Sequence, residues 1–306
     1  MQPPRPYRIE PVSNEPLRGI LLIVGAFVTF SMLDTTAKYL VQIYPTGQVV
    51  WARYAGHVVL AALILLPQHG LGLLQTARPG LQVIRSLLLF GATCANFAAL
   101  QYLQLAETSA IFFSTPLMVA VLAVPLLGER VGPRRWAAIC VGFLGVMVVV
   151  RPGLGLMHWA VSLSLLSALC GGLYQIATRK LAGVDRAVTT TFYSALIGAL
   201  AITPLVPFVW QTPNLRDALL MLSLGVFGGF GHWLLILAHR LAPAPILAPF
   251  NYIQLLPMVV FGYIVFGDFP DHWTLIGAGV VLSSGLYLLY RERKVKPDKP
   301  PSALPG

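Results

Sequence analysis

The chain has 306 residues, of which 57% are hydrophobic and only 10% charged, and its formal net charge is +10. About a quarter of the residues in a soluble domain are charged, so this composition excludes an ordinary soluble protein and indicates an all-α integral membrane protein in contact with the lipid bilayer. The three cysteines lie inside apolar runs and predict no disulfide framework.

About 20 consecutive apolar residues are needed to cross a bilayer as a helix, and the chain offers ten such runs. They fall at residues 17–41, 47–67, 82–104, 107–127, 134–151, 158–178, 188–210, 217–239, 244–267 and 272–290. The first 16 residues are polar and Pro-rich, and we expect them to form a cytoplasmic tail. We expect residues 292–306 to form a disordered, basic cytoplasmic tail.

The distribution of lysine and arginine tests this count, because cytoplasmic loops carry an excess of both. If the N-terminus is inside and the spans alternate, 17 of the 21 basic residues fall on the inner side. The exceptions are Lys38, Arg151 and Arg216 outside and Arg53 within the second span. Ten spans with both termini in the cytoplasm therefore explain the basic charge, and no nucleic-acid partner is expected.

Two segments share one order of residues: an apolar run, a glycine, an acid, a proline and a tryptophan. Residues 126–136 read LLGERVGPRRW, and residues 265–273 read VFGDFPDHW. The first turn carries arginines and faces inward in this topology, whereas the second carries aspartates and faces outward. Five spans separate the two turns, so the second copy is inverted. We predict two inverted five-helix repeats, residues 17–151 and 152–291, around a central cavity, as in many secondary transporters.

The segments TPLMVAVLAVPLLGERVGPRRWAAICVGFLGVMVVVRPG at 115–153 and APFNYIQLLPMVVFGYIVFGDFPDHWTLIGAGVVLSSGLYLLYRER at 248–293 resemble the EamA-like transporters of the drug/metabolite transporter superfamily. In the second, PFNYIQLL and VFGDFPDHWTLIGA are similar to a bacterial branch that includes riboflavin and S-adenosylmethionine uptake carriers. The resemblance implies ten helices in two repeats and a location in the bacterial inner membrane. It transfers no substrate, because the family carries amino acids, nucleosides, vitamins and drugs.

Ionisable side chains inside the spans are candidates for the site, since each costs about 2.5–3.5 kcal/mol in the membrane. Asp34 and Lys38 lie four residues apart in the first span, and Arg53 and His57 four apart in the second, so each pair shares a helix face. We expect the first pair to be either a structural ion pair or part of the site. Arg53 has no acid on its own helix. It is expected to bind an anionic substrate group or to exchange partners with Asp34 as an outer gate closes.

Uncharged polar side chains inside the spans either bond to a neighbouring helix or line the cavity, because lipid offers them no partner. The candidates for substrate binding are Asn96, Tyr174, Gln175, His232, Asn251, Tyr252 and Gln254. With nearby aromatic residues, they suit a planar ring with polar edges. Positions 251 and 254 share a helix face, whereas position 252 is about 100° from 251. The three cannot all face one cavity unless this Pro-flanked helix unwinds.

These features favour a non-ATP secondary transporter of a small polar or aromatic metabolite over other classes. An enzyme would need a catalytic motif such as His-Glu-x-x-His or Gly-x-Ser-x-Gly, and the sequence contains neither. A channel would need rings of pore charges. No metal and no cofactor are expected. Uptake of a vitamin or cofactor and export of amino acids or drugs both remain open, as do the coupling ion, for which Asp34 and His232 are candidates, and the oligomeric state.

Overall fold

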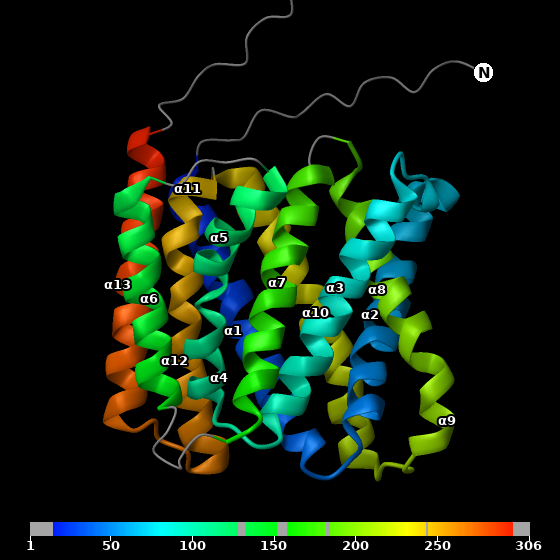
Figure 1. Ribbon diagram of the computed structural model, residues 1–306. Helices are drawn as coiled ribbons and strands as arrows, with labels where there is room; N and C mark the ends of the chain where they lie inside the picture. The colour runs from blue at the N-terminus through cyan, green and yellow to red at the C-terminus, as the bar shows by residue number, and fades with distance from the viewer. Residues whose placement is uncertain (1–14, 128–131, 152–157, 182–183, 243, 296–306) are drawn as a thin grey trace, which may run out of the picture.

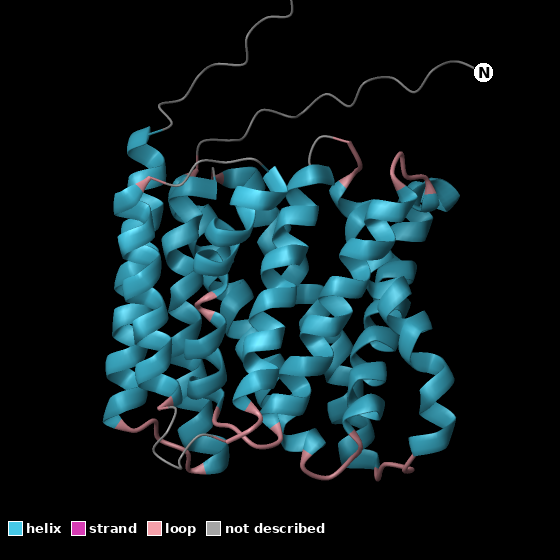
Figure 2. Ribbon diagram, viewed as in Figure 1, coloured by secondary structure: helices cyan, strands magenta, loops and turns pink. Residues whose placement is uncertain are grey.

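The computed structural model describes residues 15–127, 132–151, 158–181, 184–242 and 244–295. Within these ranges all regular structure is helical, as Figure 2 shows. Ten helical segments are long and apolar enough to cross a membrane, in agreement with the ten spans predicted from the sequence. The first turn analysed above, at residues 128–131, lies outside the described residues.

Seven spans are continuous helices. They are α1 (Pro16–Val41), α2 (Thr46–His69), α3 (Pro79–Leu100), α6 (Pro133–Val150), α7 (Val161–Leu181), α10 (Leu215–Leu241) and α13 (His272–Val295). A short 3-10 helix, η1 (Gly70–Leu74), follows α2. Three of these helices begin with proline, which fits the first turn because its missing N–H has no partner there in any case.

Three spans are interrupted, each in a stretch that contains prolines. The fourth span consists of α4 (Leu105–Phe112) and α5 (Thr115–Leu127), the seventh of α8 (Ala187–Ile202), η2 (Thr203–Leu205) and α9 (Val206–Val209). The ninth consists of α11 (Ala244–Leu247), the 3-10 helix η3 (Ala248–Gln254), α12 (Leu255–Phe261) and the π-helix η4 (Gly262–Phe266).

The break between α4 and α5 is visible within the bundle in Figure 2. Pro116 has no N–H to donate, so it leaves the carbonyl of Phe112 without its usual helical partner. The hydroxyl of Thr115 donates to that carbonyl at 2.6 Å. A side chain thus replaces the lost backbone bond, which is how interrupted helices are tolerated in a membrane.

The first helix, α1, begins and the last helix, α13, ends on the same side of the bundle, at the top of Figure 1. We call this side the terminal face. The other side, where residues 42–45, 101–104, 210–214 and 267–271 connect the helices, is the opposite face. The spans run alternately between the two faces, so the sixth span, α7, begins at the opposite face from α1.

Helices of the first half pack mainly against helices of the second. The most extensive pairs are α1 with α10, α6 with α13, α3 with α7, and α2 with α8 and α10. Exchanging the two halves converts the α1/α10 pair into the α7/α3 pair and leaves α6/α13 and α2/α8 unchanged. This pairing is consistent with two five-helix repeats related by a pseudo-two-fold axis.

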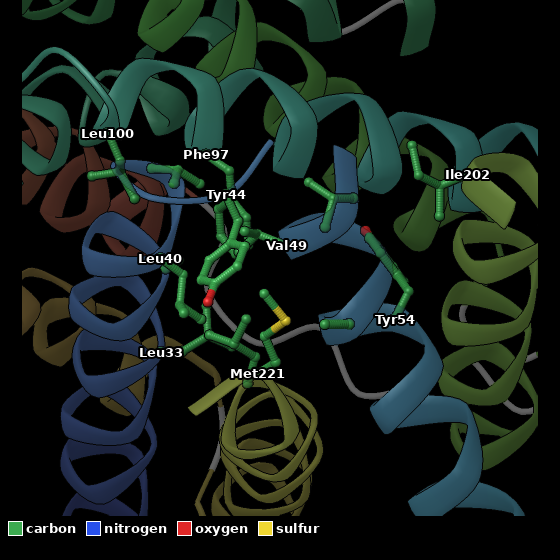
Figure 3. Close-up of a cluster of buried hydrophobic side chains, with 14 of the residues drawn as sticks. Leu33, Leu40, Tyr44, Val49, Tyr54, Phe97, Leu100, Ile202 and Met221 are labelled. Carbon is green, nitrogen blue, oxygen red and sulfur yellow. The ribbon is translucent and has the colours of Figure 1, made fainter. Parts of the chain in front are cut away.

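Glycines bring α2 and α10 close together. A Cβ atom added to Gly225 would lie 2.6 Å from the backbone of Gly56, which excludes a larger residue without movement of the helices. Beside this contact, apolar side chains of α1, α2, α3, α8 and α10 form a buried cluster, which includes Leu40, Phe97 and Met221 and is drawn in Figure 3. These contacts join the two halves around the site described next.

Candidate functional site

A cavity lies inside the bundle where α2, α3, α7, α8 and α10 meet. It is lined by Arg53, Tyr54, His57, Arg85, Leu89, Tyr174, Thr191, Ser194, Ala195 and His232. Helices α2 and α3 belong to the first half of the chain and the other three to the second. The structure therefore brings together four of the predicted site residues, namely Arg53, His57, Tyr174 and His232.

The cavity is narrow in this conformation. The space left between the lining side chains holds roughly one water molecule, and an organic metabolite does not fit. The lining helices must separate before such a molecule can enter.

Arg85 approaches the cavity from the terminal face. It lies six residues after the start of α3, about 9 Å along the helix axis, and only 4% of its surface is exposed. Its Nε donates to Oγ1 of Thr178 at 2.7 Å, and its Nη2 donates to Oη of Tyr174 at 2.6 Å. Its Nη1 donates to Oγ of Ser194 at 2.7 Å and to the carbonyl of Thr190 at 3.1 Å. All four acceptors are neutral, so they orient the guanidinium without compensating its charge.

Arg53 approaches from the other direction, seven residues after the start of α2. Its Nη1 donates to the hydroxyl of Thr93, which also bonds to the phenol of Tyr54 at 2.9 Å. The guanidinium carbon lies 5.1 Å from the ring centre of Tyr54 and 5.7 Å from that of Phe97, within the range of cation–π attraction. Aromatic faces and a hydroxyl thus hold Arg53 in place.

Asp34 does not pair with Lys38, contrary to one of the two sequence expectations for this pair. Asp34 accepts a hydrogen bond from Nδ2 of Asn96 at 3.2 Å. Lys38 is one turn nearer the opposite face, where the connection after η4 brings Asp268 within 2.7 Å of its Nζ. Lys38 also donates to the carbonyl of Leu103 at 3.0 Å. The two members of the pair therefore serve different neighbours.

The Lys38–Asp268 pair changes which basic residue is left without an acid. By sequence alone, Asp34, Lys38 and Arg53 together carry one net positive charge. In the structure Asp268 neutralises Lys38, and Arg53 acts on Asp34 through its charge. Among the described residues, neither Arg53 nor Arg85 forms an ion pair. The charge without a nearby carboxylate is therefore that of Arg85.

The two histidines of the cavity lie against each other. The rings of His57 and His232 are nearly parallel, with centres 5.8 Å apart, and Phe30 packs edge-on against His232 at 5.1 Å. In the part of the chain that the structure describes, no group of three or more His, Cys, Asp or Glu side chains is placed to hold a metal ion. Stacked against each other, the two histidine rings form an aromatic wall of the cavity.

The remaining predicted site residues do not line this cavity. Gln175 and Asn251 are exposed, Gln254 is partly buried, and Tyr252 is buried against Phe113, with ring centres 5.3 Å apart. Tyr252 of η3 faces a core cluster, whereas Asn251, one residue earlier on the same helix, is exposed. Their role in substrate binding stays a prediction.

At the terminal face, Asp185 joins the connection between α7 and α8 to the start of α3. It accepts hydrogen bonds from the Thr76 hydroxyl, the Ala77 N–H and the Gln82 amide. Partial burial raises the pKa of Asp185, but these bonds and the charge of Arg78 outweigh that effect, so its pKa lies below the ordinary value. Asp185 is ionised at neutral pH.

Sequence reasoning missed Arg85. It lies close to the start of its span, and we counted it with the cytoplasmic charges that obey the positive-inside rule. The signal that could have found it is its position three residues inside the predicted span 82–104, together with Tyr174 and Ser194 as polar residues within two other spans. Only the folded arrangement shows that these residues meet.

A ten-helix membrane bundle with a polar and aromatic cavity between its halves has the architecture of a small-molecule transporter. Residues 17–151 and 158–291 match the EamA-like transporter family. The chain belongs to this family, which confirms the resemblance noted in the sequence. It is a multi-pass membrane transporter and not an enzyme.

Curated relatives point to different cargoes. The S-adenosylmethionine uptake transporter of Rickettsia prowazekii is 28% identical over 92% of this chain and 96% of its own length. The riboflavin transporter of Rhizobium johnstonii is 30% identical over 90% and 92%. The pseudopaline exporter CntI of Pseudomonas aeruginosa is 27% identical over 90% and 97%. A solved crystal structure, 17% identical, superposes with a TM-score of 0.60 over 92% of this chain and 99% of that one, which supports the fold alone.

Proposed function

We propose that the chain is a secondary transporter that takes up a small polar or aromatic metabolite by alternating access, driven by a gradient and not by ATP. The observation that carries this proposal is the cavity itself. Arginine, histidine and tyrosine side chains from both halves of the chain converge inside the bundle, and a cluster of this kind in a membrane is costly to keep without a ligand.

The narrow cavity supports alternating access. A metabolite can enter only when helices of the two halves separate, and the α2/α8 and α3/α7 contacts that line the cavity are contacts between halves. We propose that residues 17–151 and 152–291 are the two inverted repeats, and that both termini are cytoplasmic. In this orientation the terminal face is the inner face.

One of the relatives named above is an uptake transporter, which supports uptake as the first direction to test. Export is the second candidate because another is an exporter. Asp34, partly buried beside Arg53, is the candidate group for proton coupling.

Transport by purified protein in liposomes tests the proposal. At least one compound among labelled riboflavin, S-adenosylmethionine and a wider panel of amino acids and nucleosides should accumulate under an imposed proton gradient in the absence of ATP. Arg53→Lys keeps the charge but loses the fork geometry, so it should retain little transport, and Arg53→Ala should retain none. Asp34→Asn should slow transport without changing the preference between substrates.

Wild-type transport by a well-inserted Arg53→Ala protein would assign this arginine to anchoring α2. Flux only from the side of the terminal face would favour export. The absence of gradient-driven flux for both labelled compounds, and for a wider panel of amino acids and nucleosides, would contradict secondary transport.

A further inference from the structure

The cavity carries a positive charge that no described carboxylate compensates. Asp34 stands beside Arg53, and Asp268 pairs with Lys38. Asp185 accepts a hydrogen bond from Gln82, which lies one turn before Arg85 on α3. Among the described residues, however, Asp185 forms no ion pair with Arg85. A guanidinium cannot lose its proton in a protein, so Arg85 remains a cation inside the membrane.

The hydrogen bonds of Arg85 leave one of its N–H groups available. A guanidinium has five N–H groups, and four of those of Arg85 are donated to Thr178, Thr190, Ser194 and Tyr174. The fifth is the second N–H of Nη2. Three helices, α3, α7 and α8, thereby fix the orientation of the group before any ligand arrives.

Tyr174 adds a second donor at the same place. Its hydroxyl oxygen accepts from Nη2 of Arg85, so the hydroxyl proton is left for another acceptor, and none is recorded for it among the described residues. Its ring also lies 4.4 Å from the guanidinium carbon. The free N–H is on Nη2 of Arg85 and the O–H is on Oη of Tyr174, and these two atoms are 2.6 Å apart. This spacing suits the two oxygens of one anionic group.

We propose that Arg85 and Tyr174 bind an anionic group of the transported substrate, a carboxylate or a phosphate, and that this transporter therefore carries organic anions or zwitterions. The proposal rests on the proposed transport function. Arg53 faces the same cavity from the other side, and the stacked His57 and His232 rings provide an aromatic wall for the rest of the molecule. Neutral metabolites of the same shape bind less well because they leave the Arg85 charge uncompensated.

Thermal unfolding of the purified full-length protein in detergent micelles tests this site with matched probes. Benzoate and indole-3-acetate are compared with benzamide and indole-3-acetamide, which have nearly the same shape and no charge. Phenyl phosphate distinguishes phosphate from carboxylate recognition. We expect the anions to raise the Tm and the amides to leave it unchanged, because only a ligand bound to the native state stabilises it.

Substitutions locate the effect. Arg85→Gln should weaken the binding of the anion by about tenfold or more, and Arg85→Lys should weaken it less, since a lysine keeps the charge but loses the fork. Tyr174→Phe removes one donor and should cause a partial loss. If Arg85→Gln fails to fold, the other two variants carry the test. Arg134→Gln, at an exposed position at the start of α6, is the matched control and should behave as wild type.

Several results would overturn the proposal: equal shifts for acids and amides, no shift with any anion, or full anion binding by Arg85→Gln. These results are separate from a failure of the transport function. Anion binding without flux in liposomes would contradict transport and leave the site standing. Flux of labelled organic anions at the wild-type rate through Arg85→Gln would contradict the site and leave transport standing.

Discussion

The two faces of the bundle are held closed in different ways. At the opposite face, Lys38 pairs with Asp268 and Arg151 pairs with Asp271, each at 2.7 Å. Both pairs join the first half of the chain to the second. At the terminal face, Asp185 of the second half bonds to uncharged groups of the first. Ion pairs close one face, whereas hydrogen bonds connect the halves at the other, where the Tyr193 hydroxyl also donates to the carbonyl of Leu74.

Hydrogen bonds add to the closure of the opposite face. The phenol of Tyr44 donates to Asp217 at 2.8 Å, and the side-chain amide of Gln48 exchanges two hydrogen bonds with the backbone of Gln211, at 2.7 and 2.9 Å. These contacts tie the α1–α2 connection and the start of α2 to the connection before α10 and to the first turn of α10. Among the described residues, both ion pairs between the halves lie at the opposite face, so we expect the terminal face to open more readily from this conformation.

The largest effect is expected in cysteine labelling, which should differ between the two faces. In a protein without native cysteines, Pro133→Cys at the terminal face should be shielded from an impermeant thiol reagent in intact cells. The sequence suggests Pro270 for the matching position, but Pro270 is buried, whereas Phe269 is 61% exposed. Phe269→Cys should therefore react nearly completely. Labelling of both positions from the same side would contradict the inverted topology and the assignment of the two faces.

The sequence predicts the number and order of the spans because each must satisfy the same requirement of length and apolarity. It does not predict which charges meet. Lys38 and Asp268 are 230 residues apart, and nothing local distinguishes Asp268 from Asp34 as the partner of Lys38. Arg85 was missed for a related reason: its partners lie on two other helices, so its burial depends on tertiary packing.

The second prediction concerns substitutions that break the Lys38–Asp268 ion pair of the opposite face. The side chain of Lys38 is 6% exposed and that of Asp268 is 30% exposed. Asp268→Asn leaves a buried ammonium without its anion and should destabilise the protein by about 3 kcal/mol. Lys38→Met instead leaves a carboxylate that water can reach, so its cost should be about 1 kcal/mol.

Thermal or denaturant unfolding in micelles measures this asymmetry, and the double variant should cost less than the sum of the two single changes. Equal costs for the two substitutions would show that burial of Lys38 does not control the strength of the pair. Opening of the opposite face should also increase the reactivity of Pro270→Cys, at a buried position, when either change is added.

The third prediction concerns the terminal face. Asp185→Asn replaces one carboxylate oxygen with an NH2 group, which cannot accept the hydrogen bonds that Thr76, Ala77 and Gln82 donate. The change should lower the free energy of unfolding by about 1–2 kcal/mol, after allowance for solvent exposure. Because the pKa of Asp185 is lowered by folding, its contribution is complete above its ordinary value of 3.8 and is lost as the pH falls through the lower folded value. The stability difference between wild type and variant should therefore be constant near neutral pH and shrink below about pH 4. A difference that grows on acidification would have the wrong sign for this mechanism.

The smallest expected effect concerns the second ion pair of the opposite face, between Arg151 and Asp271. The two side chains are 27% and 38% exposed, so Arg151→Gln should cost no more than about 1 kcal/mol. Arg151 also ends α6 in the left-handed conformation, with φ = 50°, which costs a residue with a side chain about 1 kcal/mol and costs glycine little. Arg151→Gly loses the same ion pair but relieves this strain, so it should be at least as stable as Arg151→Gln in thermal unfolding. If Arg151→Gly is instead less stable than Arg151→Gln, strain at the positive φ of residue 151 is smaller than the contribution of having a side chain there. A cost well above about 1 kcal/mol for Arg151→Gln would show that Arg151–Asp271, like Lys38–Asp268, has a large effect on the closure of this face.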